Sequence, residues 1–206
     1  VDPLYGAAVG YLEKPFLSFG CDVKAVHNYF DPLFGGGLPD PSEKRTGELK
    51  QELVKEKRHL GLAVDGDADR FGAVDQERFY APNELIALVA EYLLTVKKAK
   101  GQIVRSVATT HLLDAIAAAH NCELVETPVG FKYIGEIMTK EDIIIGGEES
   151  NGLTIHRHIP EKDGIIACLL VVEMAARNKK NIKQLLKELE EKTGPFFNTR
   201  KNYKIS

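Results

Sequence analysis

Apolar and polar residues recur along the chain with two different periods, which predict helices and strands in alternation. Apolar residues three or four positions apart predict helices, and these stretches are residues 4–17, 48–57, 82–96, 112–119, 131–138, 165–176 and 181–192. Short apolar or alternating runs predict strands, and these are residues 21–27, 60–64, 71–74, 103–108, 122–125 and 143–145. Glycine and proline interrupt both periods, so their clustering makes residues 34–41 a loop. The alternation indicates an α/β protein.

A lysine-rich stretch at residues 97–101 separates two runs of this pattern. We expect a domain boundary there, which gives one domain over residues 1–97 and another over residues 98–206. The alternative is a solvated helix end, where cations interact favourably with the helix dipole.

The composition narrows the class of protein. The chain has 206 residues, of which 44% are hydrophobic and 28% charged, as in ordinary globular proteins. Its formal net charge of -3 argues against a general nucleic-acid-binding protein, which is normally basic. The longest apolar run, residues 164–176, is interrupted by Glu173, so we expect no membrane-spanning helix.

The ends and the cysteines suggest a cellular setting. The first residues do not resemble a signal peptide, and three scattered cysteines do not form a disulfide framework. We therefore expect a protein of the reducing cytoplasm. The abrupt start without methionine suggests a fragment of a longer chain.

Three carboxylates, Asp65, Asp67 and Asp69, follow a predicted buried strand at every second position. Such close like charges repel one another unless a cation neutralises them, and carboxylate oxygens suit Mg²⁺, Ca²⁺ or Mn²⁺. A solvated acidic turn is the plainer alternative. An EF-hand is excluded, because Arg70 and Gln76 stand where its Gly and Glu are needed. A phosphatase of the haloacid-dehalogenase type is disfavoured, because Asp69 stands where that motif resembles Thr or Val.

A second polar loop, residues 146–152, contains Glu148 and Ser150, whose oxygens could bind sugar hydroxyls. A polar turn at a strand end is an equally good interpretation. Farther on, His156, His158 and Lys162 precede a predicted buried helix, a suitable place for a phosphate. Zinc is disfavoured there, because no third His or Cys lies at ligand spacing.

Residues 127–132 offer another possible anion site at a predicted helix start. Thr127 supplies a hydroxyl, Gly130 a flexible backbone and Lys132 an ammonium group. A solvated helix residue is the alternative interpretation of Lys132.

Taken together, these segments resemble the α-D-phosphohexomutase family, the phosphoglucomutases and phosphomannomutases. The matching segments are Asp65–Arg70, Thr127–Lys132, Gly147–Gly152 and His158–Gly164, and both their order and their spacing agree. The resemblance covers nearly the whole chain as the second and third of the family's four domains. It implies two similar three-layer α/β domains, each with a mixed, mostly parallel sheet between helices.

The resemblance also implies a reaction. In this family, a phosphoserine gives its phosphoryl group to a hexose 1-phosphate or 6-phosphate, and the bisphosphorylated sugar returns the other one. The substrates implied are glucose 1-phosphate and 6-phosphate or the mannose analogues, with glucose 1,6-bisphosphate as the intermediate.

The same resemblance implies roles for individual residues. Mg²⁺ would be held by Asp65, Asp67 and Asp69. Arg70 would lie beside the transferring phosphate, and Lys162 would act on a proton or the phosphate. The remaining substrate-binding positions would be Thr127, Gly130, Lys132, Glu148, Ser150 and His158.

Two motifs of the family have no counterpart in this sequence. They are the phosphoserine loop, which resembles Thr-Ala-Ser-His-Asn-Pro, and the phosphate loop of the fourth domain, which resembles Arg-x-Ser-Gly-Thr-Glu-Pro. We therefore expect the first and fourth domains to be missing partners, and the isolated chain to be inactive. A magnesium-dependent sugar-phosphate phosphatase and a sugar-phosphate-binding module without turnover stay open as alternatives.

Overall fold

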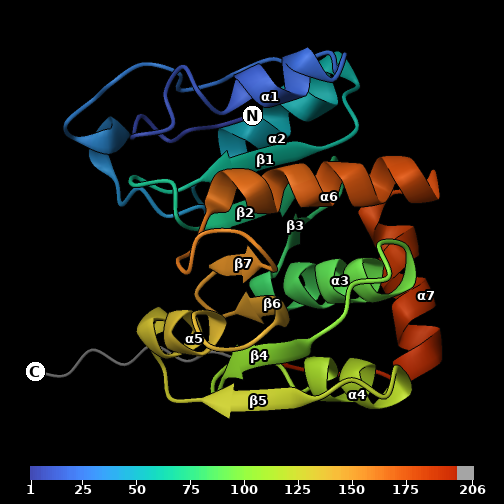
Figure 1. Ribbon diagram of the computed structural model, residues 1–206. Coiled ribbons are helices and arrows are strands. Elements are labelled where there is room, and N and C mark those ends of the chain that lie inside the picture. Colours follow the sequence, from blue (N-terminus) through green and yellow to red (C-terminus); the bar gives the residue numbers. More distant parts are fainter. Residues whose placement is uncertain (199–206) are drawn as a thin grey trace, which may run out of the picture.

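The computed structural model describes residues 1–198 and arranges them as two sheets with helices packed around them (Figure 1). The helical elements are α1 (Glu13–Ser18), a 3₁₀ turn η1 (Phe34–Gly36), α2 (Gly47–Glu56), α3 (Pro82–Thr95), α4 (Leu112–Ala119), α5 (Phe131–Met138), α6 (Gly164–Asn178) and α7 (Ile182–Thr193). The strands are β1 (Gly61–Val64), β2 (Phe71–Val74), β3 (Phe79–Tyr80), β4 (Gln102–Ser106), β5 (Leu124–Thr127), β6 (Ile143–Gly147) and β7 (Leu153–Ile155).

The first sheet has the order β1-β2-β3, and both pairs are antiparallel. Asp2 adds a parallel bridge to Ala63 at the outer edge of β1. Successive side chains of a strand point to opposite faces. Ala63 and Val74 accordingly pack with Leu49 and Leu53 of α2 on one face, whereas the other face belongs to the main core, where α6 contacts both β1 and β2.

The second sheet has the order β5-β4-β6-β7. β4 pairs in parallel with both β5 and β6, and only β7 runs antiparallel. Val104 and Ile143 pack against Phe131 and Ile134 of α5 on one face. Helices α3 and α4 cover the other face.

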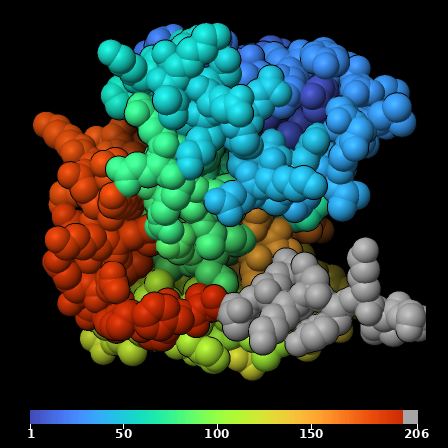
Figure 2. All heavy atoms as spheres, turned by 180° about the vertical axis from the view of Figure 1, so that it is seen from behind, coloured from blue at the N-terminus to red at the C-terminus, as the bar shows by residue number. Residues whose placement is uncertain are grey.

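Two helices connect the sheets into one body. The main core draws buried residues from β1, β2, β4, β6 and β7 together. α6 contacts β1, β2 and β7, and α3 contacts β2, β6, α4, α6 and α7. Seen from behind, the green atoms of β3 and α3 lie between the blue and cyan first part of the chain and the yellow-green β4–β5 part (Figure 2). The boundary at residues 97–98 stays a prediction, because α3 packs against elements on both sides of it.

The α/β class and the two helix-flanked sheets are confirmed, but one detail of the expected fold is wrong. A mostly parallel sheet describes only the second sheet, because β1, β2 and β3 are joined by short turns that force antiparallel pairing. The sequence also missed β3 and β7, which are only two and three residues long.

The N-terminal expectations need further correction. The helix expected over residues 4–17 exists only from Glu13, because Leu4, Tyr5 and Gly10 adopt left-handed φ values of 44°, 63° and 75°. No strand forms over residues 21–27. That segment instead binds the chain start, where the Val26 amide donates to the Val1 carbonyl at 2.9 Å.

Within residues 1–198, no helix is long and apolar enough to cross a membrane. The longest helix described, α6, has 15 residues.

Candidate functional site

The three aspartates lie on the tight turn between β1 and β2. Asp65 is buried, Asp69 is half-buried and Asp67 is exposed, and one carboxylate oxygen from each lies within 4.8 Å of the others. Ala68 takes a left-handed φ of 65°, which turns the chain back toward β2. The three carboxylate oxygens therefore lie close enough together to be ligands of one ion.

Two cations orient these carboxylates. The backbone amide and Nε of Arg70 donate to the two oxygens of Asp65, at 3.0 and 2.6 Å. Lys162 Nζ lies 2.6 Å from Oδ2 of Asp69. The other oxygen of Asp69, Oδ1, is buried and accepts no hydrogen bond, although Nε of Arg70 lies 3.6 Å from it. A buried carboxylate oxygen that accepts no hydrogen bond is energetically costly. These carboxylate ligands would therefore suit a bound cation.

Burial also affects the charges of this loop. It raises the pKa of Asp65 to about 6, although the hydrogen bonds from Arg70 act in the opposite direction. A bound cation would favour the ionised form and reverse that shift. For Lys162, burial disfavours the ammonium, but Asp69 and the nearby glutamates outweigh it and raise its pKa, so Lys162 stays protonated.

The second polar loop joins β6 to β7. Glu148 is only 5% exposed, and its Oε1 accepts a 2.9 Å hydrogen bond from the amide of Gly130 at the start of α5. The Ser150 hydroxyl donates to Oε2 of Glu148 at 3.4 Å. The structure therefore brings Gly130, Glu148 and Ser150 together.

Backbone contacts join this loop to the aspartate turn. The Phe71 amide donates to the Asn151 carbonyl at 3.0 Å, beside a bridge between Arg70 and Gly152. A Cβ on Gly152 would lie 2.2 Å from Cδ of Lys162, so glycine at this position leaves room for the lysine to reach Asp69. The two loops come from different sheets and lie side by side.

The start of α6 completes this group. Asp163 caps the helix by accepting from the amides of Ile165 and Ile166. Its second oxygen lies 2.8 Å from Nε2 of His158, which fixes that imidazole. The Gly164 amide donates to the Ala68 carbonyl at 2.9 Å, so the helix begins directly against the aspartate turn.

Thr127 and Lys132 make contacts of another kind. The Thr127 hydroxyl is buried and turns toward the Arg105 carbonyl, at 3.4 Å. Lys132 is exposed and its ammonium lies 4.9 Å from the centre of the Tyr133 ring. Their roles toward a ligand stay predictions.

The sequence reasoning missed Asp40, which lies 2.8 Å from Nη1 of Arg70. With Arg70, Ser150 and Asn151 it lines an open cleft of about 430 Å³. The Pro39-Asp40-Pro41 sequence marked a rigid loop, but nothing in it indicated that the loop returns to the aspartate turn.

The sequence matches two family descriptions in succession. Residues 1–78 match "Phosphoglucomutase/phosphomannomutase, alpha/beta/alpha domain II", and residues 81–193 match domain III of the same family. The second match therefore begins at α3.

Curated relatives agree with these matches. Phosphoglucomutase-1 of Homo sapiens is 31% identical over 98% of this chain and 37% of the relative. Phosphoglucomutase-2 of Paramecium tetraurelia is 36% identical over 87% of the chain and 33% of the relative. A phosphoglucomutase/phosphomannomutase of Thermococcus kodakarensis is 31% identical over 92% and 41%. The chain spans well under half the length of these proteins.

Solved structures agree as well. A Thermus thermophilus protein assigned as a phosphomannomutase has a TM-score of 0.87 at 36% identity, over 94% of this chain and 45% of that one. Paramecium parafusin, a phosphoglucomutase in an open form, has a TM-score of 0.79 at 30% identity, over 94% and 37%. At 16% identity and a TM-score of 0.65, the N-acetylphosphoglucosamine mutase of Aspergillus fumigatus, solved with GlcNAc-6P and magnesium, shares the fold over 90% of this chain and 48% of its own. The chain belongs to the phosphoglucomutase/phosphomannomutase family.

Proposed function

We propose that this chain is the metal-binding and sugar-binding part of an enzyme that interconverts hexose 1-phosphates and hexose 6-phosphates. The observation that carries this proposal is the junction of the two loops. Three convergent carboxylates, one with a buried oxygen that accepts no hydrogen bond, are joined through Phe71 and Asn151 to the loop that presents Glu148 and Ser150.

Asp65, Asp67 and Asp69 would hold Mg²⁺. Their ligand atoms are all carboxylate oxygens, which this ion prefers. When bound, the ion supplies positive charge that stabilises a transferring phosphoryl group. Arg70 binds both Asp65 and Asp40 and therefore lies beside the proposed metal site.

Glu148 and Ser150 would bind sugar hydroxyls. A carboxylate accepts and a hydroxyl both donates and accepts, so the pair suits the adjacent hydroxyls of a hexose. The sequence Gly147-Glu148-Glu149-Ser150 resembles the phosphoglucomutase branch, so we propose glucose-configured substrates. Comparable affinities for glucose 1-phosphate and mannose 1-phosphate would contradict this preference.

Lys162 and His158 would bind the phosphate group of the sugar. Lys162 is held protonated beside Asp69 and can donate hydrogen bonds or a proton, and His158 is oriented by Asp163. Thr127, Gly130 and Lys132 would extend this binding along the start of α5.

We propose that the phosphoserine and the remaining phosphate contacts come from domains outside these 206 residues. Without a serine that carries a phosphoryl group, the chain has nothing to transfer, so it should bind ligands without turnover. The family matches favour this mutase interpretation over a dehalogenase-type phosphatase.

We also propose a reducing cytoplasmic setting, which agrees with the free state of Cys21, Cys122 and Cys168.

Calorimetry with Mg²⁺ and NMR broadening by Mn²⁺ test the metal site. Asp67→Asn should weaken binding roughly tenfold, because one anionic ligand is lost, and replacing all three aspartates with Asn should abolish it. Asp22→Asn is the control, since that carboxylate is exposed on the surface. Equal Mn²⁺ broadening in the wild type and the triple variant would refute the assignment.

A second assay tests the transfer function. The isolated chain should show no conversion of glucose 1-phosphate to glucose 6-phosphate with added glucose 1,6-bisphosphate. Addition of the serine-bearing first domain and the fourth domain of a relative should restore activity. Turnover by the chain alone would contradict the proposed division of labour.

A further inference from the structure

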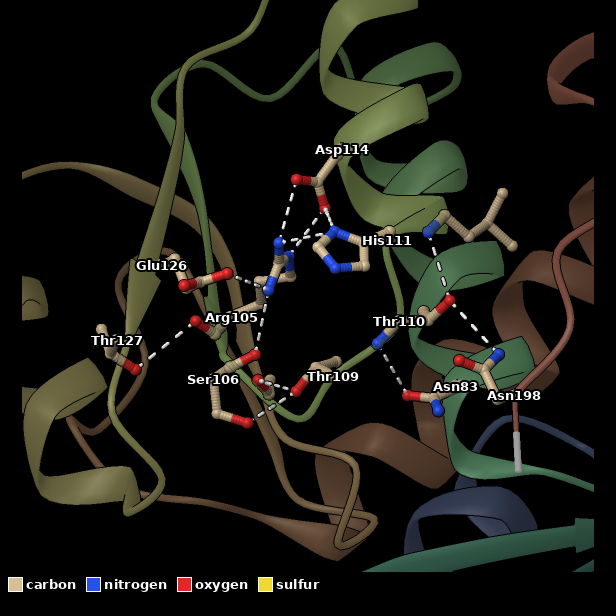
Figure 3. Close-up of polar contacts among 12 residues, drawn as sticks. Asn83, Arg105, Ser106, Thr109, Thr110, His111, Asp114, Glu126, Thr127 and Asn198 are labelled. Carbon is tan, nitrogen blue, oxygen red and sulfur yellow. Dashed lines mark hydrogen bonds and ion pairs between the residues drawn. The ribbon is translucent and has the colours of Figure 1, made fainter. Parts of the chain in front are cut away.

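A buried polar cluster lies behind the sugar-binding loop, at the end of β4 (Figure 3). Arg105, Ser106 and Thr109 are each 2% exposed or less. None of them was among the functional residues predicted from the sequence. Polar groups this deeply buried need partners, and their partners connect the sheet to the loop.

Arg105 makes the end of β4 rigid. Its Nε and Nη2 bind the two oxygens of Asp114 on α4 at 2.7 and 2.9 Å, and its Nη1 lies 2.9 Å from Glu126 on β5. Nη2 also lies 3.0 Å from Nδ1 of His111. One guanidinium thus joins β4, β5 and α4, as its planar set of donors allows.

Ser106, the residue after Arg105, connects β4 to the loop between β6 and β7. The Ser106 hydroxyl donates to Oε2 of Glu149 at 2.8 Å and shares a second 2.8 Å hydrogen bond with Thr109. The Thr109 hydroxyl lies 3.4 Å from the Gly147 carbonyl. Because Ser106 gives its proton to Glu149, the Thr109 hydroxyl donates to Ser106 and not to Gly147. The cluster therefore holds the loop at Glu149, directly after Glu148.

We propose that Ser106 and Thr109 are positioning residues for the sugar-binding loop. They hold the Glu149 carboxylate against β4, so that Glu148 alone is directed toward Gly130 and Ser150. Without this restraint, two adjacent carboxylates would compete for the same donors and repel each other. The inference deepens the proposed function, because it rests on Glu148 as a sugar ligand.

Hydrogen exchange of the ligand-free chain tests the positioning. The amide of Glu148 donates to the Gly152 carbonyl at 3.0 Å, so its exchange reports opening of the loop. Ser106→Ala and Glu149→Ala should each speed that exchange roughly 2- to 10-fold, the range of one hydrogen bond. Glu149→Gln keeps an acceptor for Ser106 and should stay close to wild type.

Thr46→Ala is the matched control, because Thr46 is equally buried but its hydroxyl binds the Ser42 carbonyl in the first part of the chain. It should leave the Glu148 amide unchanged after correction for global stability from urea unfolding. Exchange in Ser106→Ala equal to wild type, or raised equally at the amides of β1, would overturn the proposal.

Glucose 1-phosphate binding in the presence of Mg²⁺ is measured separately. Ser106→Ala should raise Kd roughly 2- to 10-fold, and Glu149→Gln should keep a Kd close to that of the wild type. If the wild type binds no glucose 1-phosphate, the proposed function fails, while the exchange data still decide whether Ser106 positions the loop. An unchanged Kd in Ser106→Ala would overturn the link to Glu148.

Discussion

The two matched parts of the chain reach their folds by different means. In the second part, residues 81–193, helices and strands alternate from α3 to β6. Helices α6 and α7 begin with the side-chain caps Asp163 and Asn181, whereas α4 and α5 have none. In the first part, residues 1–78, residues 19–46 contain one short 3₁₀ turn as their regular structure, and neither α1 nor α2 has a side-chain cap.

Individual contacts replace periodic structure in the first part. Buried Asp2 accepts from the Leu4 amide at 2.8 Å and binds His27, which in turn contacts Glu48. Gly6 lies against the backbone of Gly66. The comparison teaches that the first part depends on single residues, whereas the second distributes its stability over repeated packing. Point substitutions can test this difference.

The largest effect is expected for Gly6→Ala. A Cβ at this position would lie 2.3 Å from the Gly66 carbonyl oxygen, a backbone atom beside the aspartate turn. Overpacking against backbone should destabilise the protein by about 3 kcal/mol and displace Asp65 and Asp67. Urea unfolding and Mg²⁺ calorimetry measure the two consequences.

Gly47→Ala is the control for this prediction. Gly47 lies at the start of α2, and an added Cβ would meet nothing within 4 Å. Its free energy of unfolding should stay at or slightly above the wild-type value. If both alanine variants were equally stable, close packing at Gly6 would not be a weak point of the first part.

This difference also explains how far the fold was predictable. Apart from β3 and β7, the segments from α2 to α7 follow apolar periods that survive in the structure, and α4 and α5 begin and end where the sequence placed them. The N-terminal segment failed because its conformation is set by non-local partners: Asp2 pairs with β1, and Val26 binds Val1. Such contacts leave no periodic signal.

The second prediction concerns the buried charge of the second part. Arg105→Met removes the cation that Asp114 and Glu126 share. Because both carboxylates are partly exposed and can be hydrated, we expect a loss of about 2–3 kcal/mol in unfolding free energy, below the cost of a fully buried pair.

Arg78→Met is the matched control, because Arg78 forms a more exposed pair with Glu84. We expect it to cost no more than about 1 kcal/mol. Chemical denaturation of both variants measures the difference. Equal losses would mean that burial does not distinguish the two pairs.

The site was predictable where its residues are consecutive. Asp65, Asp67 and Asp69 formed a recognisable motif, and the structure brings their oxygens together. Asp40 and Ser106 were not recognisable, because the first reaches Arg70 across 30 positions and the second reaches Glu149 across 43. Nothing in the sequence around an Asp or a Ser residue indicates a partner so far along the chain.

A third prediction tests the capped helices of the second part. The Asn181 side chain accepts from the Gln184 amide at 2.9 Å, and the Gln184 side chain accepts in return from the Asn181 amide. Asn181→Ala should lower the unfolding free energy by about 1 kcal/mol. Asn178→Ala, at the other side of the same turn, is the comparison variant in the same urea experiment. A cost for Asn178→Ala as large as that for Asn181→Ala would contradict the capping role.

The smallest predicted effect is a pH dependence confined to the first part. Burial disfavours the His27 imidazolium, but the carboxylates of Asp2 and Glu48 outweigh it and raise the pKa of His27 above its usual value. Burial also raises the pKa of Asp2, so its proton too is favoured by folding. The folded state therefore binds protons more tightly than the unfolded state, and stability falls as pH rises.

For His27 this contribution is complete below the unfolded pKa of about 6.5 and is lost as pH rises through the higher pKa of the folded state. From pH 6 to pH 8.5, the free energy of unfolding measured in urea should decrease for the wild type. It should decrease less for His27→Gln. Glu48→Gln removes one of the two carboxylates and should give an intermediate decrease. The loss should appear as a lower protection factor, which corrects for the intrinsic rise of amide exchange with pH, at the Val64 amide, which donates to the Asp2 carbonyl at 3.0 Å. The Ile103 amide between β4 and β5 should be much less affected, because its 2.8 Å bond to the Glu123 carbonyl lies in the regular sheet. An equal pH response at both amides would remove the distinction between the two parts of the chain.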